Sequence, residues 1–136
     1  MVVVNTHLQA QYPARGNRYE DLRLRQIEQL VAYARKGLDA DALVVAGDFN
    51  TREEEKAHYG ALSAAFEDLT SALRRGCGEC GTYIARDGAE SWWIDYVFAR
   101  ANGGRIAARV DRIRNHKRDD PYSDHHGLWV ELELAR

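Results

Sequence analysis

Four groups of polar or ionisable residues lie at or near the ends of apolar segments in this sequence. They are His7, Asp48 with Asn50, Asp95, and Asp124 with His125. The strand ends of one sheet can meet in a common cleft, and catalytic groups are commonly carried on loops that such a scaffold holds in place. We therefore expect these side chains, although far apart along the chain, to gather in one site.

The residue types in these groups suit hydrolysis of a phosphoester with the help of a metal ion. Carboxylate and carboxamide oxygens, here of Asp48, Asn50 and Asp124, are ligands for Mg²⁺, and Mn²⁺ is the alternative ion. His125 can act as a general base if a carboxylate fixes its tautomer, and Asp95 is the candidate for that carboxylate. We predict a Mg²⁺-dependent phosphodiester hydrolase in which water activated by His125 attacks phosphorus.

His7 has a separate role in this prediction, because it can donate a hydrogen bond to a phosphoryl oxygen on which negative charge builds. Each group also has a structural interpretation. The sequence Gly-Asp-Phe-Asn at 47–50 is typical of a turn, His7 can be a satisfied core histidine, and Asp95 can be an edge-strand charge. The catalytic interpretation depends on the four groups occurring together.

Apolar periodicity predicts the elements that position these residues. Segments 2–8 and 42–46 are short and almost continuously apolar, which is typical of buried strands. Segment 18–36 predicts an amphipathic helix that ends at Gly37. Its apolar positions are Leu22, Ile27, Leu30, Val31 and Ala34. Residues 51–54, Thr-Arg-Glu-Glu, form a capping box that predicts a second helix through about residue 66.

The second half of the chain predicts loops and strands. Residues 68–91 are rich in Gly, Asp and Ser, which favours loops with one short strand at 82–84. Segment 91–100 is strongly β-prone, and 105–114 is compatible with a strand or a helix, of which we favour the strand. The chain closes with a strand that alternates apolar and polar residues, the apolar ones being Leu128, Val130, Leu132 and Leu134.

Length and composition limit the possible functions. The chain has 136 residues, of which 45% are hydrophobic and 29% charged, and this is typical of one globular domain. Its net charge of −2 lacks the global basic bias of many proteins that bind nucleic acid. No apolar run approaches the roughly 20 residues that cross a bilayer, and the opening Met-Val-Val-Val is too short for a secretory signal. As written, the chain is expected to be soluble and cytoplasmic.

Two further motifs have several interpretations. Cys77 and Cys80 are compatible with half a zinc site, a redox pair or a small disulfide loop. Because a second ligand pair at zinc-finger spacing is missing, we interpret them as two thiols in a flexible loop. Trp92 and Trp93 suit a lipid headgroup or a membrane surface. Large aromatic residues generally dominate cores, so we favour packing of this pair against the sheet.

The segments NTHL, GDFN, IDYVF and SDHHGL, in this order, resemble motifs in the carboxy-terminal half of the endonuclease/exonuclease/phosphatase superfamily, the fold of DNase I. The resemblance covers nearly the whole chain. It implies an α+β (α/β sandwich) fold, namely half of a DNase I-like four-layer α-β-β-α sandwich, with mainly one mixed or antiparallel sheet and helices on one face. It also implies a phosphate contact by the histidine of NTHL, His7.

The resemblance implies roles for the other site residues. Asp48 matches the residue that orients or activates the attacking water, and Asn50 matches the one that contacts phosphate. Asp124 matches a metal ligand and His125 matches the general base. Asp95, the acid of IDYVF, matches the carboxylate behind that base.

Within this superfamily, the segments THLQAQY and RGNRYEDLRLRQIEQL look most like those of neutral sphingomyelinases and related bacterial phosphodiesterases. The resemblance implies a phosphodiester substrate, either a phospholipid headgroup or a nucleic acid. A phospholipid substrate would bring the protein to a membrane surface. A DNA endonuclease or exonuclease of the same superfamily is the alternative enzyme.

One difference from the superfamily concerns its amino-terminal half. Members carry another sheet there, together with the Glu that is a principal metal ligand, whereas this sequence starts at the strand that carries His7. We therefore expect a single domain over residues 1–136 that lacks this half. Its sheet would expose an apolar face, which predicts a homodimer or a companion chain. The alternative function is a noncatalytic half-domain that has kept the motifs.

Overall fold

The computed structural model describes residues 1–11, 19–36, 40–78, 80–86, 88–89, 91–114 and 123–135. The predicted helix end at Gly37 lies outside these residues. Within them the chain forms six strands and three helices.

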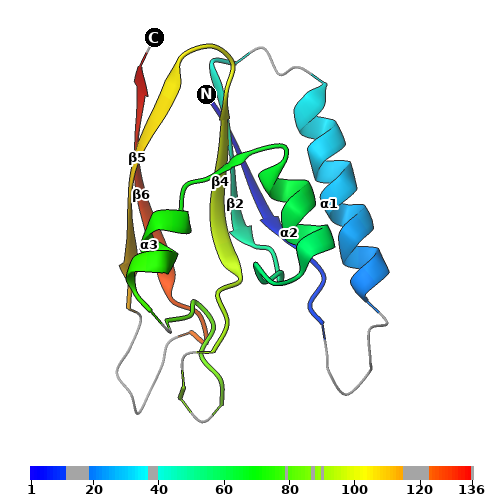
Figure 1. The fold of residues 1–136 in the computed structure, drawn as a ribbon, viewed down its shortest axis with the longest axis vertical. Coiled ribbons are helices and arrows are strands. Elements are labelled where there is room, and N and C mark those ends of the chain that lie inside the picture. Colours follow the sequence, from blue (N-terminus) through cyan, green and yellow to red (C-terminus); the bar gives the residue numbers. More distant parts are fainter. Residues whose placement is uncertain are drawn as a thin grey trace.

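A four-stranded mixed sheet occupies the middle of the molecule (Figure 1). Its strands are β1 (Val2–His7), β2 (Ala42–Asp48), β4 (Asp95–Ala101) and the two-residue β3 (Glu67–Asp68), in the order β1-β2-β4-β3. β1 and β2 are parallel, because helix α1 (Glu20–Arg35) returns the chain to the same end of the sheet. β4 runs antiparallel to both of its neighbours. β1, β2 and β4 confirm the strands predicted at 2–8, at 42–46 and in the β-prone segment 91–100.

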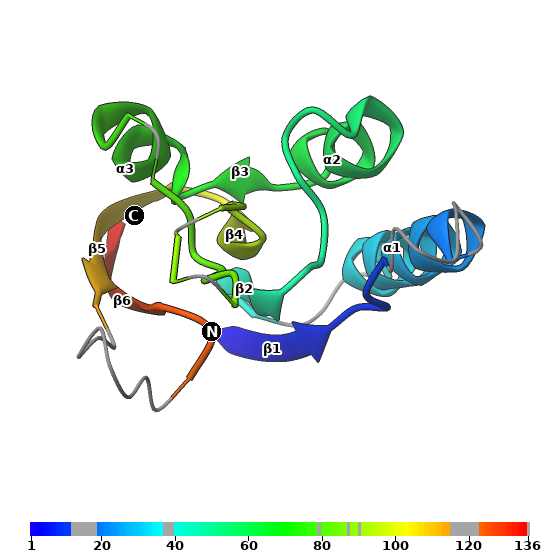
Figure 2. The same cartoon turned by 90° about the horizontal axis from the view of Figure 1, so that it is seen from below.

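A second, two-stranded antiparallel sheet consists of β5 (Arg105–Ile113) and β6 (Gly127–Ala135), and we call it the β5–β6 ribbon. Figure 2 shows this ribbon on one side of the four-stranded sheet, with α1 and α2 (Lys56–Ser63) on the other. The strand that we favoured over a helix at 105–114 is therefore confirmed. The alternating strand at the end of the chain is confirmed as well.

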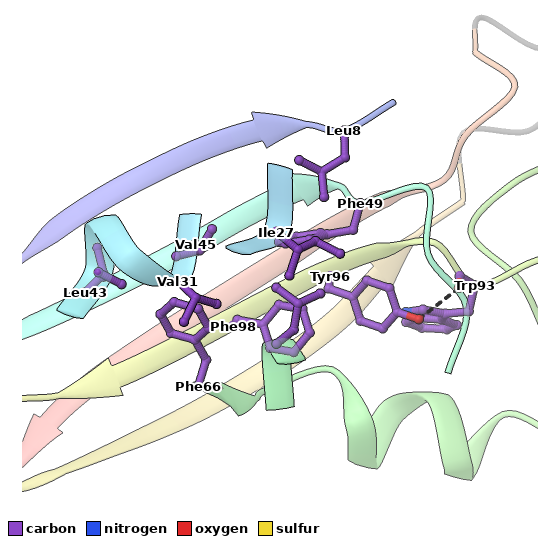
Figure 3. Packing of buried hydrophobic residues seen from close by; sticks show 12 residues of the cluster. Leu8, Ile27, Val31, Leu43, Val45, Phe49, Phe66, Trp93, Tyr96 and Phe98 are labelled. Carbon is purple, nitrogen blue, oxygen red and sulfur yellow. Dashed lines mark hydrogen bonds between the residues drawn. The ribbon is translucent and has the colours of Figure 1, made fainter. Parts of the chain in front are cut away.

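Both faces of the four-stranded sheet are covered where β2 and β4 pair. The helix side carries the larger buried cluster (Figure 3), which includes Ile27 and Val31 of α1, Leu43 and Val45 of β2, and Tyr96 and Phe98 of β4. On the opposite face, Val44, Val97 and Ala99 pack against Leu128 and Val130 of the ribbon. Because neighbouring positions of β2 are buried on opposite faces, this strand is apolar at successive positions.

Two expectations about the helices are wrong. α2 begins at Lys56 and has no side-chain cap, and Thr51 of the expected capping box donates its hydroxyl to the Phe49 carbonyl instead. Such a local bond to the backbone competes with helix capping. A third helix, α3 (Ser71–Gly76), lies within the segment that composition assigned to loops. With six residues it is too short for apolar periodicity to reveal.

The first helix is present as predicted, but its buried face differs. Leu22 is 44% exposed, whereas Arg23 is fully buried. The Arg23 guanidinium forms an ion pair with Glu55, just before α2, and donates a hydrogen bond to Gln11. A buried charge is tolerated where a carboxylate pairs with it. In this turn of α1, hydrophobic periodicity therefore assigned the wrong residue to the buried face.

The interpretation of Cys77 and Cys80 as two thiols is wrong, because they form a disulfide. The two tryptophans differ: Trp93 is buried in the core, as we favoured for the pair, whereas Trp92 is 41% exposed.

Within the described ranges, the structure contains no helix with the length and apolar character needed to span a membrane. With a mixed sheet, a second small sheet and few helices, the α+β fold expected of half a DNase I-like sandwich is confirmed.

Candidate active site

Three of the predicted site residues lie in one row across three neighbouring strands. His7, the last residue of β1, pairs with Asp48, the last residue of β2, and Asp48 pairs with Asp95, the first residue of β4. Residues directly opposite each other on neighbouring strands point to the same face of a sheet. Val44 and Val97 lie on this face too, since each is an even number of residues from the acid on its strand, and they pack against the ribbon. The face is thus apolar in its middle and ionisable at its end.

The turn at 47–50 holds Asp48 and Asn50 in a fixed relation. Gly47 has φ +137°, and a Cβ at this position would lie 1.9 Å from the Thr6 carbonyl oxygen, so the position requires glycine. Asn50 has φ 48°, a left-handed conformation that asparagine tolerates better than most residues. Its backbone N–H donates to Asp48 Oδ1 at 2.7 Å, and its Nδ2 donates to Asp48 Oδ2 at 3.1 Å. The carboxamide therefore orients the carboxylate at the end of β2.

Asp48 faces both predicted catalytic histidines. Its Oδ2 lies 3.4 Å from His7 Nε2 and 3.9 Å from His125 Nε2. The Asp48 side chain is 15% exposed and that of His7 is 74% exposed, so His7 is open to a ligand. Burial raises the pKa of the Asp48 carboxyl, and the N–H of Asn50 opposes this effect while the charge of Asp95 adds to it. A cation near the two carboxylates would offset the cost of their burial.

Asp95 and His125 form a hydrogen-bonded pair. His125 Nδ1 lies 2.8 Å from Asp95 Oδ2, close enough for Nδ1–H to donate to the carboxylate. This hydrogen bond raises the pKa of His125, and partial burial of the imidazole acts against it. With the proton of the neutral ring on Nδ1, Nε2 is the nitrogen that can accept another proton. The geometry suits an oriented general base.

Asp48, Asp95 and His125 offer ligand atoms that lie within 4.8 Å of one another, the only such group of three among the described residues. Within this group, Asp48 is the predicted metal ligand, and its carboxylate oxygens suit a hard divalent ion, whereas Asp95 and His125 bond to each other. Asp124 is exposed and does not belong to the group, and its carbonyl oxygen accepts a hydrogen bond from the N–H of Ile84 at 2.7 Å. The metal role of Asp124 stays a prediction, as do the catalytic roles of the other site residues.

Two residues that the sequence analysis did not nominate contact the Asp95–His125 pair. Tyr83 forms an isolated β-bridge with His125, and its ring packs edge-on against the imidazole with the ring centroids 5.5 Å apart. Thr82 is fully buried and accepts hydrogen bonds from the backbone at Asp95 and at His126. In the sequence, only the short strand predicted at 82–84 pointed to these two residues. A threonine that bonds to a residue pair distant in sequence cannot be told from any other threonine by sequence alone.

A cavity of about 440 Å³ is lined by Arg52 and Trp92, among others, and by none of the predicted site residues. The Arg52 guanidinium carbon lies 5.4 Å from the centroid of the Trp92 ring. Trp92 also stacks on Tyr83, which in turn contacts His125. An aromatic and cationic surface therefore extends from the predicted general base to this cavity.

Comparison with known proteins identifies the family and the fold. The sequence model of the Endonuclease/Exonuclease/phosphatase family matches residues 1–125. None of the curated proteins matches the chain. Three solved structures have a similar fold: D. rerio TDP2 complexed with a single-strand DNA product (19% identity, TM-score 0.71), the human Nocturnin catalytic domain with bound sulfate (20%, 0.63) and beta toxin from Staphylococcus aureus (16%, 0.62).

The chain spans about half the length of these solved structures. The similarity covers 97%, 98% and 96% of this chain but 56%, 47% and 52% of the respective structures. At such low sequence identity the likeness concerns the fold alone.

Proposed function

The chain belongs to the endonuclease/exonuclease/phosphatase family, and from this premise we propose that it is a metal-dependent hydrolase of phosphodiester bonds. The observation that carries the proposal is the hydrogen-bonded Asp95–His125 pair next to Asp48, at one end of the four-stranded sheet. In this proposal the three side chains act on the water that attacks phosphorus.

His125 is the general base of the proposed reaction. Asp95 keeps the ring proton on Nδ1 and stabilises the imidazolium that forms, so Nε2 can take a proton from water. Nε2 lies 3.9 Å from Asp48 Oδ2. A water molecule within hydrogen-bonding distance of both atoms would be oriented by Asp48 and deprotonated by His125.

His7 and Asn50 complete the proposed site. The exposed His7 is available to donate a hydrogen bond to a phosphoryl oxygen. The two Nδ2 hydrogens of Asn50 are directed to Leu8 and Asp48, which leaves Oδ1 as the atom it can offer to a ligand. Because Oδ1 only accepts hydrogen bonds, it suits a cation better than a phosphate oxygen. This favours the predicted metal role of Asn50 over its predicted phosphate contact.

Asp48, Asn50 and Asp124 would hold the divalent ion, Mg²⁺ or Mn²⁺, through oxygen atoms. When bound, such an ion neutralises the charge that develops on the phosphoryl oxygens. The raised pKa of Asp48 supports a cation at this position, because burial beside Asp95 disfavours its charged form in the protein alone.

Hydrolysis of bis-p-nitrophenyl phosphate tests the proposed function. We expect the purified chain to release p-nitrophenolate with Mg²⁺ or Mn²⁺ and to stop when EDTA is added. His125→Ala should lower kcat about 10²- to 10⁴-fold, the usual contribution of a general base. A circular dichroism spectrum equal to that of the unaltered chain controls for folding. The absence of metal-dependent hydrolysis, or equal hydrolysis by both proteins, would contradict the proposed function.

The substrate class is a second part of the proposal. We infer that nucleic acid is the first class to test, because the relative TDP2 was solved with a single-strand DNA product and because Arg52 and Trp92 offer a charge and a flat ring beside the site. A nuclease should cleave single-strand DNA and bind it less tightly as salt rises. A sphingomyelinase should instead hydrolyse sphingomyelin in liposomes and lose liposome binding in Trp92→Ala.

A further inference from the structure

Residues 81–84 form a short segment between two parts of the site. On one side lies the backbone at 92–95, which leads into β4 and carries Asp95. On the other side lies the loop at 124–126, which carries His125 and leads into β6. The N–H groups of Thr82 and Tyr83 both lie 2.9 Å from the carbonyl oxygen of Trp92, and the N–H of Ile84 donates to the Asp124 carbonyl at 2.7 Å. The segment therefore bridges the two backbones that bear the proposed general base and its carboxylate.

Within this segment, Thr82 bonds to the backbone at Asp95 and to the backbone next to His125. Its hydroxyl oxygen accepts from the N–H of Ile94 at 3.0 Å and from the N–H of Asp95 at 3.1 Å. Its carbonyl oxygen accepts from the N–H of His126 at 2.7 Å. One fully buried residue thus fixes the backbone of Asp95 and the backbone next to His125.

The surroundings of Thr82 restrict its own movement. A Cβ at the preceding Gly81 would lie 2.9 Å from backbone atoms of Trp92, so the two segments approach closely and need glycine there. Arg112 of β5 donates from Nη1 to the Gly81 carbonyl at 2.7 Å. The segment is held by two strands as well as by the loop, so Thr82 is a rigid point of attachment.

We propose that Thr82 is a positioning residue for the Asp95–His125 pair, holding the carboxylate and the imidazole in register through its hydroxyl and carbonyl oxygens. For its effect on catalysis, the proposal rests on the proposed function. Its physical basis is that the hydroxyl oxygen accepts two N–H bonds here. A side chain of the same shape without that oxygen removes the partner of both N–H groups, and that of Ile94 is buried. The backbone at Asp95 then shifts to find other partners, and the 2.8 Å bond to His125 shifts with it.

Three variants test this proposal. Thr82→Val removes the hydroxyl and keeps the shape of the side chain, and Thr82→Ser keeps the hydroxyl. Thr70→Val is the matched control, because Thr70 is also fully buried but bonds its hydroxyl to Asp68, outside the site. The tautomer of neutral His125 is read from the ¹⁵N chemical shifts of its ring, which His125→Gln assigns. The kcat and KM for bis-p-nitrophenyl phosphate are measured in parallel.

We expect His125 to lose its Nδ1–H tautomer in Thr82→Val. The kcat of this variant should fall about 10- to 100-fold, because a small misplacement of catalytic groups has an effect of this size. Its KM should change less than about twofold. Thr82→Ser should retain both properties. Thr70→Val should retain them too, although its melting temperature falls. If Thr82→Val keeps the Nδ1–H tautomer and the kcat of the unaltered chain, the hydroxyl serves folding alone and the proposal is wrong.

If Thr82→Val does not fold, amide hydrogen exchange of the unaltered chain tests whether Thr82 holds the two backbones. The N–H groups of Ile94, Asp95 and His126 should then be protected from exchange together, and fast exchange at these positions would overturn the proposal. If the unaltered chain hydrolyses nothing, the proposed function fails. The ring tautomer of His125 in the three threonine variants still decides whether Thr82 positions the pair.

Discussion

At the residue scale, the pH dependence of the proposed reaction follows from the pair of Asp95 and His125. The hydrogen bond that Asp95 accepts from His125 raises the pKa of His125 above its ordinary value of 6.5. A general base must be neutral, so kcat/KM should rise with pH through this raised pKa. Asp95→Asn removes the negative charge, so the acid limb of the profile should move to lower pH while the plateau falls because the tautomer is no longer fixed. A profile of kcat/KM against pH for both proteins measures this shift, and an unmoved limb would contradict the role of Asp95.

The residues of this site differ in how much the sequence reveals about them. Asp95 could be nominated because an acid within an apolar run is unusual, whereas Asp48 and Asn50, in a sequence typical of a turn, became candidates only together with the other groups. His125 could be matched with Asp95 only through the chemistry that a base requires. Thr82 gave no such signal, since its role consists of backbone bonds to Asp95 and His126, which only the folded chain brings together.

At the element scale, the close approach of β1 and β2 depends on Gly47. A Cβ there would lie 1.9 Å from the Thr6 carbonyl oxygen, which belongs to the neighbouring strand, so one of the two strands must move. Gly47→Ala should lower the free energy of unfolding by about 3 kcal/mol, as overpacking does, and should separate His7 from Asp48. Urea unfolding measures the loss. In the control Gly60→Ala, within α2, the new Cβ meets open space, and about 0.5–1 kcal/mol of stabilisation is expected.

A second prediction at this scale concerns the attachment of α3. Arg74 of α3 donates to Asp68 of β3 at 2.9 Å and to the hydroxyl of Tyr59 at 3.1 Å, and the Arg74 and Asp68 side chains are almost buried. Burial, together with the hydrogen bond to Asp68, raises the pKa of Tyr59 to about 12, so this tyrosine stays neutral. Arg74→Met leaves the Asp68 carboxylate buried without its cation and should cost about 3–5 kcal/mol in urea unfolding.

The exposed neighbour Arg75 provides the control for this prediction. Arg75→Met changes the same helix by the same substitution but lies at the surface. It should stay within about 0.5 kcal/mol of the unaltered chain. Equal losses in the two variants would mean that helix propensity, rather than the Asp68 pair, accounts for the effect.

The elements themselves were predicted unevenly for physical reasons. Strands β2 and β6 carry strong apolar patterns because β2 is buried on both faces and Leu128, Val130 and Leu132 of β6 pack against the four-stranded sheet. α3 and the turn at 51–55 depend on contacts between distant residues, such as the ion pairs of Arg74 with Glu53 and of Arg23 with Glu55. A pattern that treats charged residues as exposed assigns Arg23 to the surface, and tertiary pairing overrides that assignment.

At the scale of the whole molecule, the face of the sheet opposite the helices is only partly covered by the described residues. The β5–β6 ribbon covers Val44 and Val97 in the middle of this face. Val3, on the edge strand β1, remains 60% exposed. On the ribbon, Ile113 is 50% exposed and Trp129 is 41% exposed. Unpaired strand edges that carry apolar side chains favour pairing with another chain.

We therefore expect purified chains to associate with one another through β1 and the ribbon as the concentration rises. Val3→Lys should weaken this association, because a charge on an edge strand opposes pairing with a second strand and costs little at an exposed position. Leu22→Lys is the control, since Leu22 is also an exposed apolar residue, at 44%, but lies on α1. Sedimentation velocity over a concentration series distinguishes the variants. Sedimentation as a monomer at every concentration, or an equal effect of both lysines, would show that these edges do not drive association.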